Sequence, residues 1–390
     1  MSNVITERKV EDKKGEEKRG YKFMGIGAAG DKGILAVLEV GEIEQDELIL
    51  INSTKKDIPE DYNGVYIGLT GKDSGCGKER AVAKEYAVRT MKSGIIKKYI
   101  TDDIDSVVLV CSIGGGTGSG ATPIIAEYCK KVLGKHVHII VFTGFEEDAR
   151  ELQNSVDFFE ELNFDCDVQV IRNSAFLEKN NNNKFRAEEA ANKELITRIR
   201  AMLGKGMIPS KQNIDTTDMY KIINTVGYKT VEHKEITEDL VDVDAFNRVI
   251  KQMIYNSKSL KSSVGQIRMG VFLNLSPASE DAVDYNYTIL KETYGVPYET
   301  FTHAQYDGGK QYITFIISGM KLPIDEVKSI NDKYIEVTAS VDNEKDDFFD
   351  KLSGLDRGSS DQFDMVRGAG KSSSTTTDED FFKSLETKPE

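Results

Sequence analysis

The chain has 390 residues, 39% of them apolar, which is enough to build the hydrophobic cores of two domains. Its formal net charge of −14 argues against binding of nucleic acid or of an anionic membrane surface through bulk charge. No apolar run approaches the roughly 18 residues that a membrane-spanning helix needs.

The N-terminal segment and the cysteines indicate the compartment. Residues 1–20 are mostly charged and polar and lack the apolar stretch of a signal peptide, so we expect a disordered leader. The four cysteines show no CxxC spacing, and the four histidines show no metal-ligand spacing. Free thiols in a reducing cytosol fit this pattern, so we expect a cytoplasmic protein without a metal site made of its own side chains.

Strands and helices alternate over the first half of the chain. Apolar, β-branched runs predict strands over residues 21–24, 47–51, 64–69, 106–110, 137–142 and 168–173. Helical spacing predicts helices over 34–40, 80–99, 121–128, about 146–162 and 185–203. This βαβ order predicts a doubly wound, mostly parallel α/β sheet that binds ligands at the carboxyl ends of its strands.

A smaller α/β region follows the long helix. Residues 266–275 and 312–318 read as strands, with a helix over about 281–294 between them and another over about 324–339. From residue 341 to residue 390 the composition turns polar and acidic, with a run of serines and threonines. We expect this last part to be a disordered acidic tail.

The most informative segment is residues 111–120, whose sequence is CSIGGGTGSG. It follows a strand and precedes a helix in whose first turn Pro123 would fit. Five glycines in seven residues let backbone N–H groups close around a phosphate chain. Thr117 and Ser119 add hydroxyl donors, and the helix N-terminus adds positive potential. A flexible loop is the alternative, but the order of strand, glycines, hydroxyls and helix is the one that a phosphate site needs.

The run of residues 114–120, GGGTGSG, resembles the signature of the tubulin and FtsZ superfamily of GTPases. Over about residues 21–322 the order of elements resembles FtsZ and its TubZ-type plasmid and phage relatives, in which a long central helix joins two domains. The resemblance implies GTP or GDP as ligand, Mg²⁺ beside the phosphates, and head-to-tail filaments of the chain with itself. It divides the chain into a leader (1–20), a GTP-binding domain (21–184), a central helix with catalytic loop (185–227), a C-terminal domain with its helix (228–340) and a tail (341–390).

The resemblance also assigns the nucleotide contacts. In the first and second loops the family's usual Asn and Asp are replaced by Asp31 and Thr54. The phosphate contacts are expected from Gly27, Ala28, Ala29, Gly30, Asn52, Gly75, Gly77, Gly114, Gly115, Gly116, Thr117, Gly118, Ser119 and Gly120. The other contacts are expected from Glu146 or its neighbour Glu147 on the ribose, Arg150 near phosphate, Asn173 and Asn192 on the guanine edge, and Phe185 stacked on the base.

Residues 213–218, NIDTTD, resemble the family's catalytic loop, which belongs to one subunit and completes the pocket of the next. Hydrolysis of a γ-phosphate needs an attacking water that is held in line and oriented by an acceptor. A carboxylate beside an Mg²⁺-bound triphosphate can do this, so Asp215 and Asp218, together with Asn213, are expected to be catalytic. Solvated aspartates in a surface loop are the alternative.

Three other functions compete with this interpretation. Residues 25–30 form a full GxGxxG after a strand, as in NAD-dependent dehydrogenases, but Asn52 stands where such an enzyme usually has an acid, and a second glycine loop would have no role. A P-loop GTPase does not fit, because residues 71–77 enclose five residues between their outer glycines and Glu79 replaces Ser or Thr. A filament component that binds nucleotide without hydrolysing it is opposed by the two aspartates of the catalytic loop.

The sequence gives less information about the cellular role than about the ligand. The divergent first and second loops favour a TubZ-like filament that segregates or positions plasmid or phage DNA, and an FtsZ-like division ring is the alternative. Residues 347–352 and 380–385 share an acidic residue, a Phe pair and a Leu. Exposed aromatic residues in an acidic tail suggest that Phe381 and Phe382 dock an adaptor protein. For residues 347–352 the alternative is that their Phe pair packs on the folded body of the protein.

Overall fold

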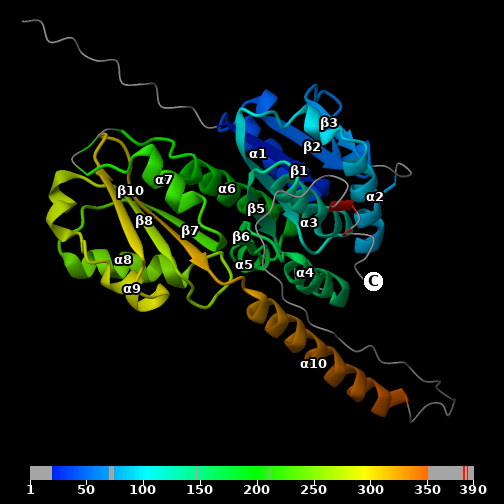
Figure 1. Cartoon of the computed structure of the whole chain (residues 1–390). Helices are drawn as coiled ribbons and strands as arrows, with labels where there is room; N and C mark the ends of the chain where they lie inside the picture. The colour runs from blue at the N-terminus through cyan, green and yellow to red at the C-terminus, as the bar shows by residue number, and fades with distance from the viewer. Residues whose placement is uncertain are drawn as a thin grey trace, which may run out of the picture.

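The computed structural model describes residues 20–69, 74–145, 148–208, 210, 212–349, 381–382 and 384. In this part of the chain the strands form a ten-stranded sheet in the order β3-β2-β1-β4-β5-β6-β7-β10-β8-β9, and helices cover both of its faces (Figure 1). The predicted α/β fold with a mostly parallel, doubly wound sheet is thereby confirmed. None of the described helices is both long enough and apolar enough to cross a membrane.

The sheet changes direction halfway. Its first strands are all parallel: β1 (Gly20–Ile26), β2 (Leu48–Asn52), β3 (Val65–Gly68), β4 (Ile104–Ser112), β5 (His136–Phe142) and β6 (Asp167–Ile171). The others are β7 (Gly227–Ile236), β8 (Arg268–Asn274), β9 (Glu299–Gln305) and β10 (Gln311–Met320). Strand β7 is parallel to β6 but antiparallel to β10, so the two halves share one continuous sheet.

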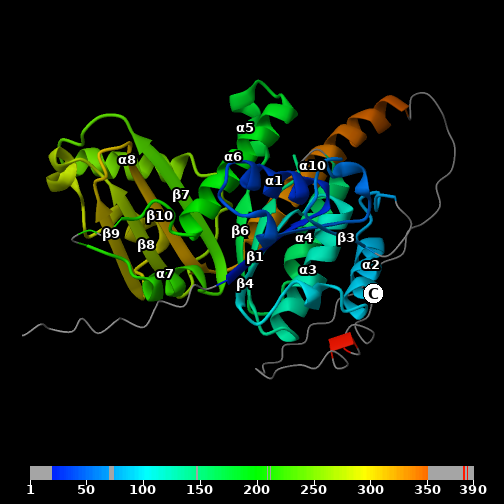
Figure 2. The same cartoon turned by 90° about the horizontal axis from the view of Figure 1, so that it is seen from above.

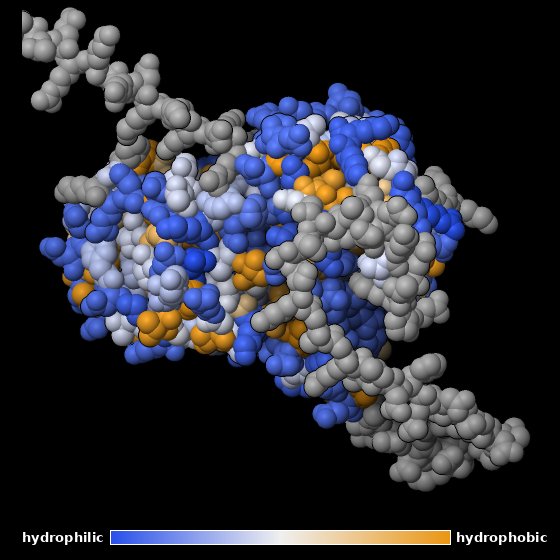
Figure 3. All heavy atoms as spheres, in the orientation of Figure 1, coloured by the Kyte–Doolittle hydropathy of each residue, from blue (hydrophilic) through white to orange (hydrophobic). Residues whose placement is uncertain are grey.

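Two hydrophobic cores lie on opposite faces of the parallel half. On one face α1 (Gly27–Glu39) packs with α6 (Lys184–Met202), where Val37 and Leu195 are fully buried. On the other face lie α2 (Arg80–Lys92), α3 (Gly116–Lys131) and α4 (Ala149–Glu161). The face of the molecule in Figure 3 is mostly hydrophilic, with hydrophobic residues in separate patches.

The remaining helices surround the antiparallel half and the exit of the chain. They are α5 (Ser174–Leu177), α7 (Thr216–Ile223), α8 (Val243–Tyr255), α9 (Thr288–Tyr294) and α10 (Ile324–Phe349), with 3-10 turns at Gln45–Glu47, Lys55–Asp57, Ile96–Lys98, Glu178–Asn180 and Pro277–Ala282. Helix α10 begins beside α4, to which Lys328 is joined by an ion pair with Glu160 at 2.6 Å (Figure 2).

Several predicted elements were wrong in extent. The helix predicted over 80–99 ends at Lys92, and the one predicted over 281–294 is a 3-10 turn followed by the short α9. Helix α3 begins at Gly116, inside the glycine run, so Pro123 lies in its interior rather than in its first turn. Strands β7 and β9 were not predicted.

The last predicted helix, over about 324–339, was also too short. Helix α10 continues to Phe349, nine residues into the segment 341–390 that was expected to be disordered. Of the rest of that segment only Phe381, Phe382 and Ser384 are described, and the expected leader lies outside the described residues apart from Gly20. The division into domains stays a prediction, since one sheet runs through both halves.

Candidate functional site

A cavity of about 380 Å³ lies at the carboxyl ends of the parallel strands. Residues at the ends of five of them line it: Ile26 of β1, Asn52 of β2, Ser112 of β4, Thr143 after β5 and Asn173 after β6. Its volume falls in the range of roughly 300–1,000 Å³ that is usual for small-molecule sites. A larger cavity of about 510 Å³ lies beside α6 and β10. The glycine segments expected of a phosphate site line the cavity of about 380 Å³ instead.

Two helices begin at this cavity. Helix α1 begins at Gly27 and α3 at Gly116, and the residues before them, Ile26 and Gly115, have no polar side chain with which to cap a helix. The first N–H groups of both helices therefore remain available at the cavity, where the helix dipoles add positive potential. Gly27 has a φ of +73°, which favours glycine, and a Cβ atom added to it would lie 3.2 Å from the nitrogen of Gly118.

Most of the predicted phosphate contacts line the cavity. They are Gly27, Ala28, Ala29, Asn52, Gly75, Gly77, Gly114, Gly115, Gly116, Thr117 and Gly118. Thr117 and Ser53 also approach each other through their hydroxyl groups, at 3.1 Å, which joins the second loop to the glycine run. Segments from four different parts of the chain thus surround one space, as a phosphate-binding site requires.

Three predicted contacts lie behind the lining. A Cβ atom on Gly30 would come within 2.1 Å of the Val110 carbonyl, so this glycine serves the packing of α1 on β4. Ser119 turns its hydroxyl back to the carbonyl of Gly115. A Cβ atom on Gly120 would lie 2.5 Å from the carbonyl oxygen of Arg80, so this glycine serves the packing of α3 on α2.

A buried amide–carboxyl pair supports the second loop. Asn52 donates from Nδ2 to Oδ2 of Asp31 at 2.8 Å, and its Oδ1 accepts from the N–H of Ser53 at 2.8 Å. Burial raises the pKa of Asp31 well above its ordinary value, and the hydrogen bond from Asn52 opposes this only in part. Asp31, at the position where the resemblance expects asparagine, therefore orients Asn52 and does not itself line the cavity.

At the other end of the cavity the aromatic residue differs from the predicted one. Phe185 is 80% exposed and lies outside the lining, whereas Phe145 lines the cavity directly after β5. Asn173 lines the cavity too, and its backbone N–H donates to Oγ1 of Thr143 at 3.2 Å. Asn192 is half-buried on α6 and does not line it. Glu146 and Glu147 lie outside the described residues.

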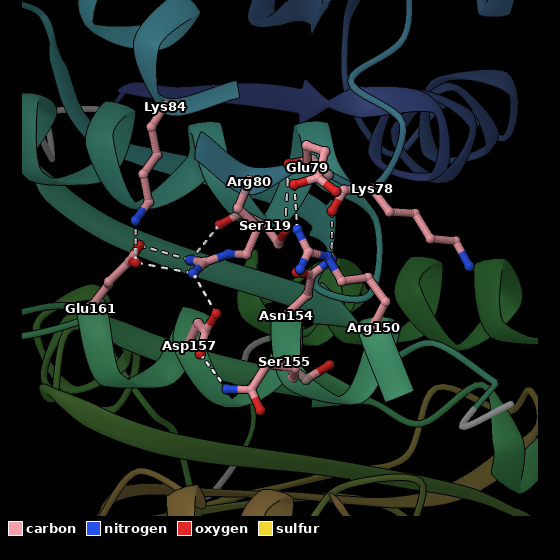
Figure 4. Close-up of polar contacts among 12 residues, drawn as sticks. Lys78, Glu79, Arg80, Lys84, Ser119, Arg150, Asn154, Ser155, Asp157 and Glu161 are labelled. Atoms are coloured by element: carbon pink, nitrogen blue, oxygen red, sulfur yellow. Dashed lines mark hydrogen bonds and ion pairs between the residues drawn. The ribbon is translucent and has the colours of Figure 1, made fainter. Parts of the chain in front are cut away.

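The predicted phosphate arginine has another partner. Arg150 forms an ion pair with Glu79 and does not line the cavity (Figure 4). Lys78, which was not predicted as a contact, lines the cavity instead. Its only signal in the sequence is the Gly77-Lys78 dipeptide, which fails the P-loop spacing.

Helices α2, α3 and α4 are joined by one arginine. Pro123 has no N–H to donate to the carbonyl of Ser119 four residues earlier, and Arg80 of α2 donates to that carbonyl instead, at 3.1 Å. Arg80 is buried and also pairs with Glu161 at 2.7 Å and with Asp157 at 3.4 Å, both on α4 (Figure 4). The start of α3, and with it the glycine run, is thereby held in place.

The predicted catalytic residues lie outside the described lining of the cavity. Asp215 is the exposed N-cap of α7, where its Oδ1 accepts from the N–H of Asp218 at 2.7 Å. Asn213 exchanges hydrogen bonds with Ser210, at 2.6 and 2.7 Å. Within a single chain, therefore, the structure does not bring these three side chains to the cavity.

The described residues fit a nucleotide better than a metal held by side chains. No group of three His, Cys, Asp or Glu side chains among them could hold a metal ion. Backbone N–H groups, the Thr117 hydroxyl and the Asn173 side chain are the donors and acceptors that phosphates and a base can use. A magnesium ion at this site would depend on phosphate oxygens for most of its ligands.

Residues 22–181 match the model of the tubulin/FtsZ family GTPase domain. The tubulin-like protein CetZ1 of Haloferax volcanii is 24% identical over 221 residues, which are 53% of this chain and 56% of that protein. The cell division protein FtsZ 1 of Thermococcus kodakarensis is 26% identical over 215 residues, 52% of this chain and 55% of that protein. The chain thus spans little more than half the length of these relatives.

Solved structures share the fold over more of the chain. TubZ of Clostridium botulinum phage c-st has a TM-score of 0.63 at 18% identity, over 81% of this chain and 98% of that one. The GTPγS-bound protofilament of CetZ2 from Haloferax volcanii has a TM-score of 0.66 at 16% identity, over 83% and 99%. These matches establish the fold, and the family model identifies the domain. Over residues 22–181, therefore, this chain is similar to the GTPase domain of the tubulin/FtsZ family.

Proposed function

We propose that this chain binds and hydrolyses GTP and assembles with itself, head to tail, into filaments whose active sites are completed between subunits. The observation that carries the proposal is the separation of two predicted parts. The glycine segments line the cavity, whereas Asp215 and Asp218 lie outside its described lining. A second subunit is then needed to bring the two parts together.

The chain's own residues have distinct tasks in this reaction. N–H groups at the starts of α1 and α3 bind phosphate oxygens, and the Thr117 hydroxyl adds a donor. Asn173 binds the guanine edge, and Phe145 packs near it. Mg²⁺ supplies charge compensation when it is bound to the phosphates. Asp215 and Asp218 of the neighbouring subunit accept hydrogen bonds from the attacking water and hold it in line.

The proposed cellular role is a cytoplasmic, TubZ-like filament that segregates or positions plasmid or phage DNA. The replaced residues Asp31 and Thr54 support it, and the buried free thiols suit the cytosol. An FtsZ-like division ring is the second candidate, and the 26% identity with an FtsZ 1 favours it. An adaptor protein on the tail completes the proposal. It would have to displace Phe381, whose side chain is 0% exposed against Tyr128.

The shared active site predicts a dependence on protein concentration. Phosphate release by the purified full chain in GTP and Mg²⁺ is measured over a wide range of protein concentrations, with sedimentation in parallel. Activity per subunit should rise steeply at the concentration where polymer first sediments, because isolated subunits lack a complete site. Constant activity per subunit well below that concentration would show that one chain suffices.

A further inference from the structure

One basic side chain lines the cavity among its described residues. Lys78 shares the lining with three acidic residues, Asp57, Glu151 and Glu188. Nucleotide phosphates are strongly anionic, and proteins that bind them usually offset this charge with lysine or arginine. Arg150 is paired with Glu79 outside the lining. Lys78 is thus the described cation best placed for this task.

The backbone of Lys78 is held in a special conformation. Gly77 and Lys78 have φ values of +57° and +64°, and a lysine adopts this left-handed region only where its surroundings keep it there. Asn154 of α4, which is 2% exposed, provides such a contact (Figure 4). Its Nδ2 donates to the Lys78 carbonyl at 3.1 Å and to the Gly114 carbonyl at 2.9 Å. Asn154 therefore ties the Lys78 segment to the glycine run.

The ammonium group of Lys78 is paired with a residue of the cavity lining. Its Nζ is 2.5 Å from Oδ2 of Asp148 and 2.9 Å from Oε1 of Glu151, which itself lines the cavity. Hydrogen bonds to Asp148 and then to Glu151 raise the pKa of Lys78, so the group carries its charge at neutral pH. The side chain is 42% exposed, so solvent screens both ion pairs, and a phosphate can compete for the ammonium.

We propose that Lys78 binds the phosphates of the nucleotide by exchanging Asp148 and Glu151 for phosphate oxygens, with Asn154 as the residue that positions it. This inference rests on the proposed function, since it takes the cavity to be the nucleotide site. It gives Lys78 the place near phosphate that the family resemblance gave to Arg150. A Cβ atom added to Gly116 would lie 2.8 Å from the carbonyl carbon of Lys78. The proposed exchange therefore takes place beside the start of α3.

The test measures nucleotide affinity by isothermal titration of the full chain with GTPγS and with GDP. Lys78→Gln removes the charge and should weaken GTPγS binding at least tenfold, whereas Lys78→Arg should retain most of the affinity. Lys84→Gln is the matched control, because Lys84 pairs with Glu161 away from the lining. Circular dichroism of each variant verifies that the fold is kept.

The outcomes separate this inference from the proposed function. If the unchanged chain binds neither nucleotide, the proposed function fails first. If it binds and Lys78→Gln binds equally well, or if Lys84→Gln weakens binding as much, Lys78 is not the phosphate cation. If Lys78→Gln unfolds, the affinities of Lys78→Arg and Lys78→Met for GTPγS are compared instead. Weaker binding by Lys78→Met supports the inference, and equal binding contradicts it.

The positioning role of Asn154 has its own readout. Asn154→Ala should weaken GTPγS binding when Lys78 is present. In a chain that already carries Lys78→Gln, it should cause little further loss of affinity, because both changes remove the same contact. Equal losses in both backgrounds would show that Asn154 acts on the site without Lys78, and the positioning role would be withdrawn.

Discussion

At the scale of single residues, the site depends on how closely backbone segments approach. Gly116 begins α3, and a Cβ atom there would lie 2.8 Å from the carbonyl carbon of Lys78 and from the nitrogen of Glu79. Such distances do not occur between real Cβ atoms and backbone, so a larger residue must push the two segments apart. The glycine at this position thus lets the start of α3 lie directly against the backbone of Lys78 and Glu79.

We therefore expect Gly116→Val to weaken GTP binding at least tenfold, roughly 1.4 kcal/mol, while the fold persists. Equilibrium binding of GTP is the measurement. Gly68→Ala is the control, because its added Cβ would meet nothing nearer than 3.6 Å and Gly68 is outside the lining. Unchanged binding in Gly116→Val would remove the glycine run from the phosphate site.

Asp215 allows a second test at this scale. Asp215→Ala should bind GTP normally but release phosphate about 100-fold more slowly, because a positioned acceptor is lost from the neighbour's site. Filaments of the variant should persist rather than turn over, as followed by light scattering. Because Asp215 also caps α7, Asp215→Asn is measured beside it to retain an acceptor for the Asp218 N–H. If Asp215→Asn hydrolyses GTP at the normal rate, a catalytic role for the Asp215 carboxylate is excluded.

At the scale of elements, Arg80 joins three helices by satisfying a carbonyl that Pro123 leaves free. Arg80→Gln should destabilise the protein by about 2 kcal/mol, since it removes hydrogen bonds between a buried charge and its partners on α4. Urea unfolding followed by circular dichroism measures this. Arg89→Gln on the same helix breaks only an exposed pair with Glu85 and should cost less than about 0.5 kcal/mol. Equal effects of the two would show that Arg80 carries no special role.

The elements also show how far sequence reasoning reaches. The glycine run and its strand were predictable, because glycine, hydroxyl and strand signals are local. The roles proposed for Lys78 and Asn154 were not, since the partners of Asn154 are 40 and 76 positions away. Strand β7 escaped prediction because it carries charged residues inside the fold. Lys229, for example, is fully buried in an ion pair with Asp167 at 2.9 Å.

At the scale of the whole molecule, two described residues of the tail, Phe381 and Phe382, pack on the body. Phe381 packs edge-on against Tyr128 of α3 with ring centres 5.5 Å apart, and Lys92 of α2 lies over the ring of Phe382. Both views of the fold show this short segment beside α2 and α3 (Figures 1 and 2). The expectation that Phe381 is exposed was wrong, because the aromatic pair completes the core around Tyr128.

Replacing both tail phenylalanines should therefore change the body. In Phe381→Ala with Phe382→Ala, hydrogen exchange at the C-terminal ends of α2 and α3 should become faster, because Tyr128 loses its cover. Exchange read by mass spectrometry checks this. Tyr255→Ala, at an exposed aromatic residue on α8, should leave the exchange of both helices as it was. Unaltered exchange in the double variant would mean that the tail does not cover this face in solution.

The partnership of Arg80 and Pro123 has a consequence for the history of the family. A helix residue other than proline at position 123 would donate its own N–H to the Ser119 carbonyl, and the guanidinium of Arg80 would lose one of its acceptors. Selection to keep an arginine at position 80 would then relax. When homologous sequences are aligned, the two positions should vary together, although they are 43 positions apart in the chain.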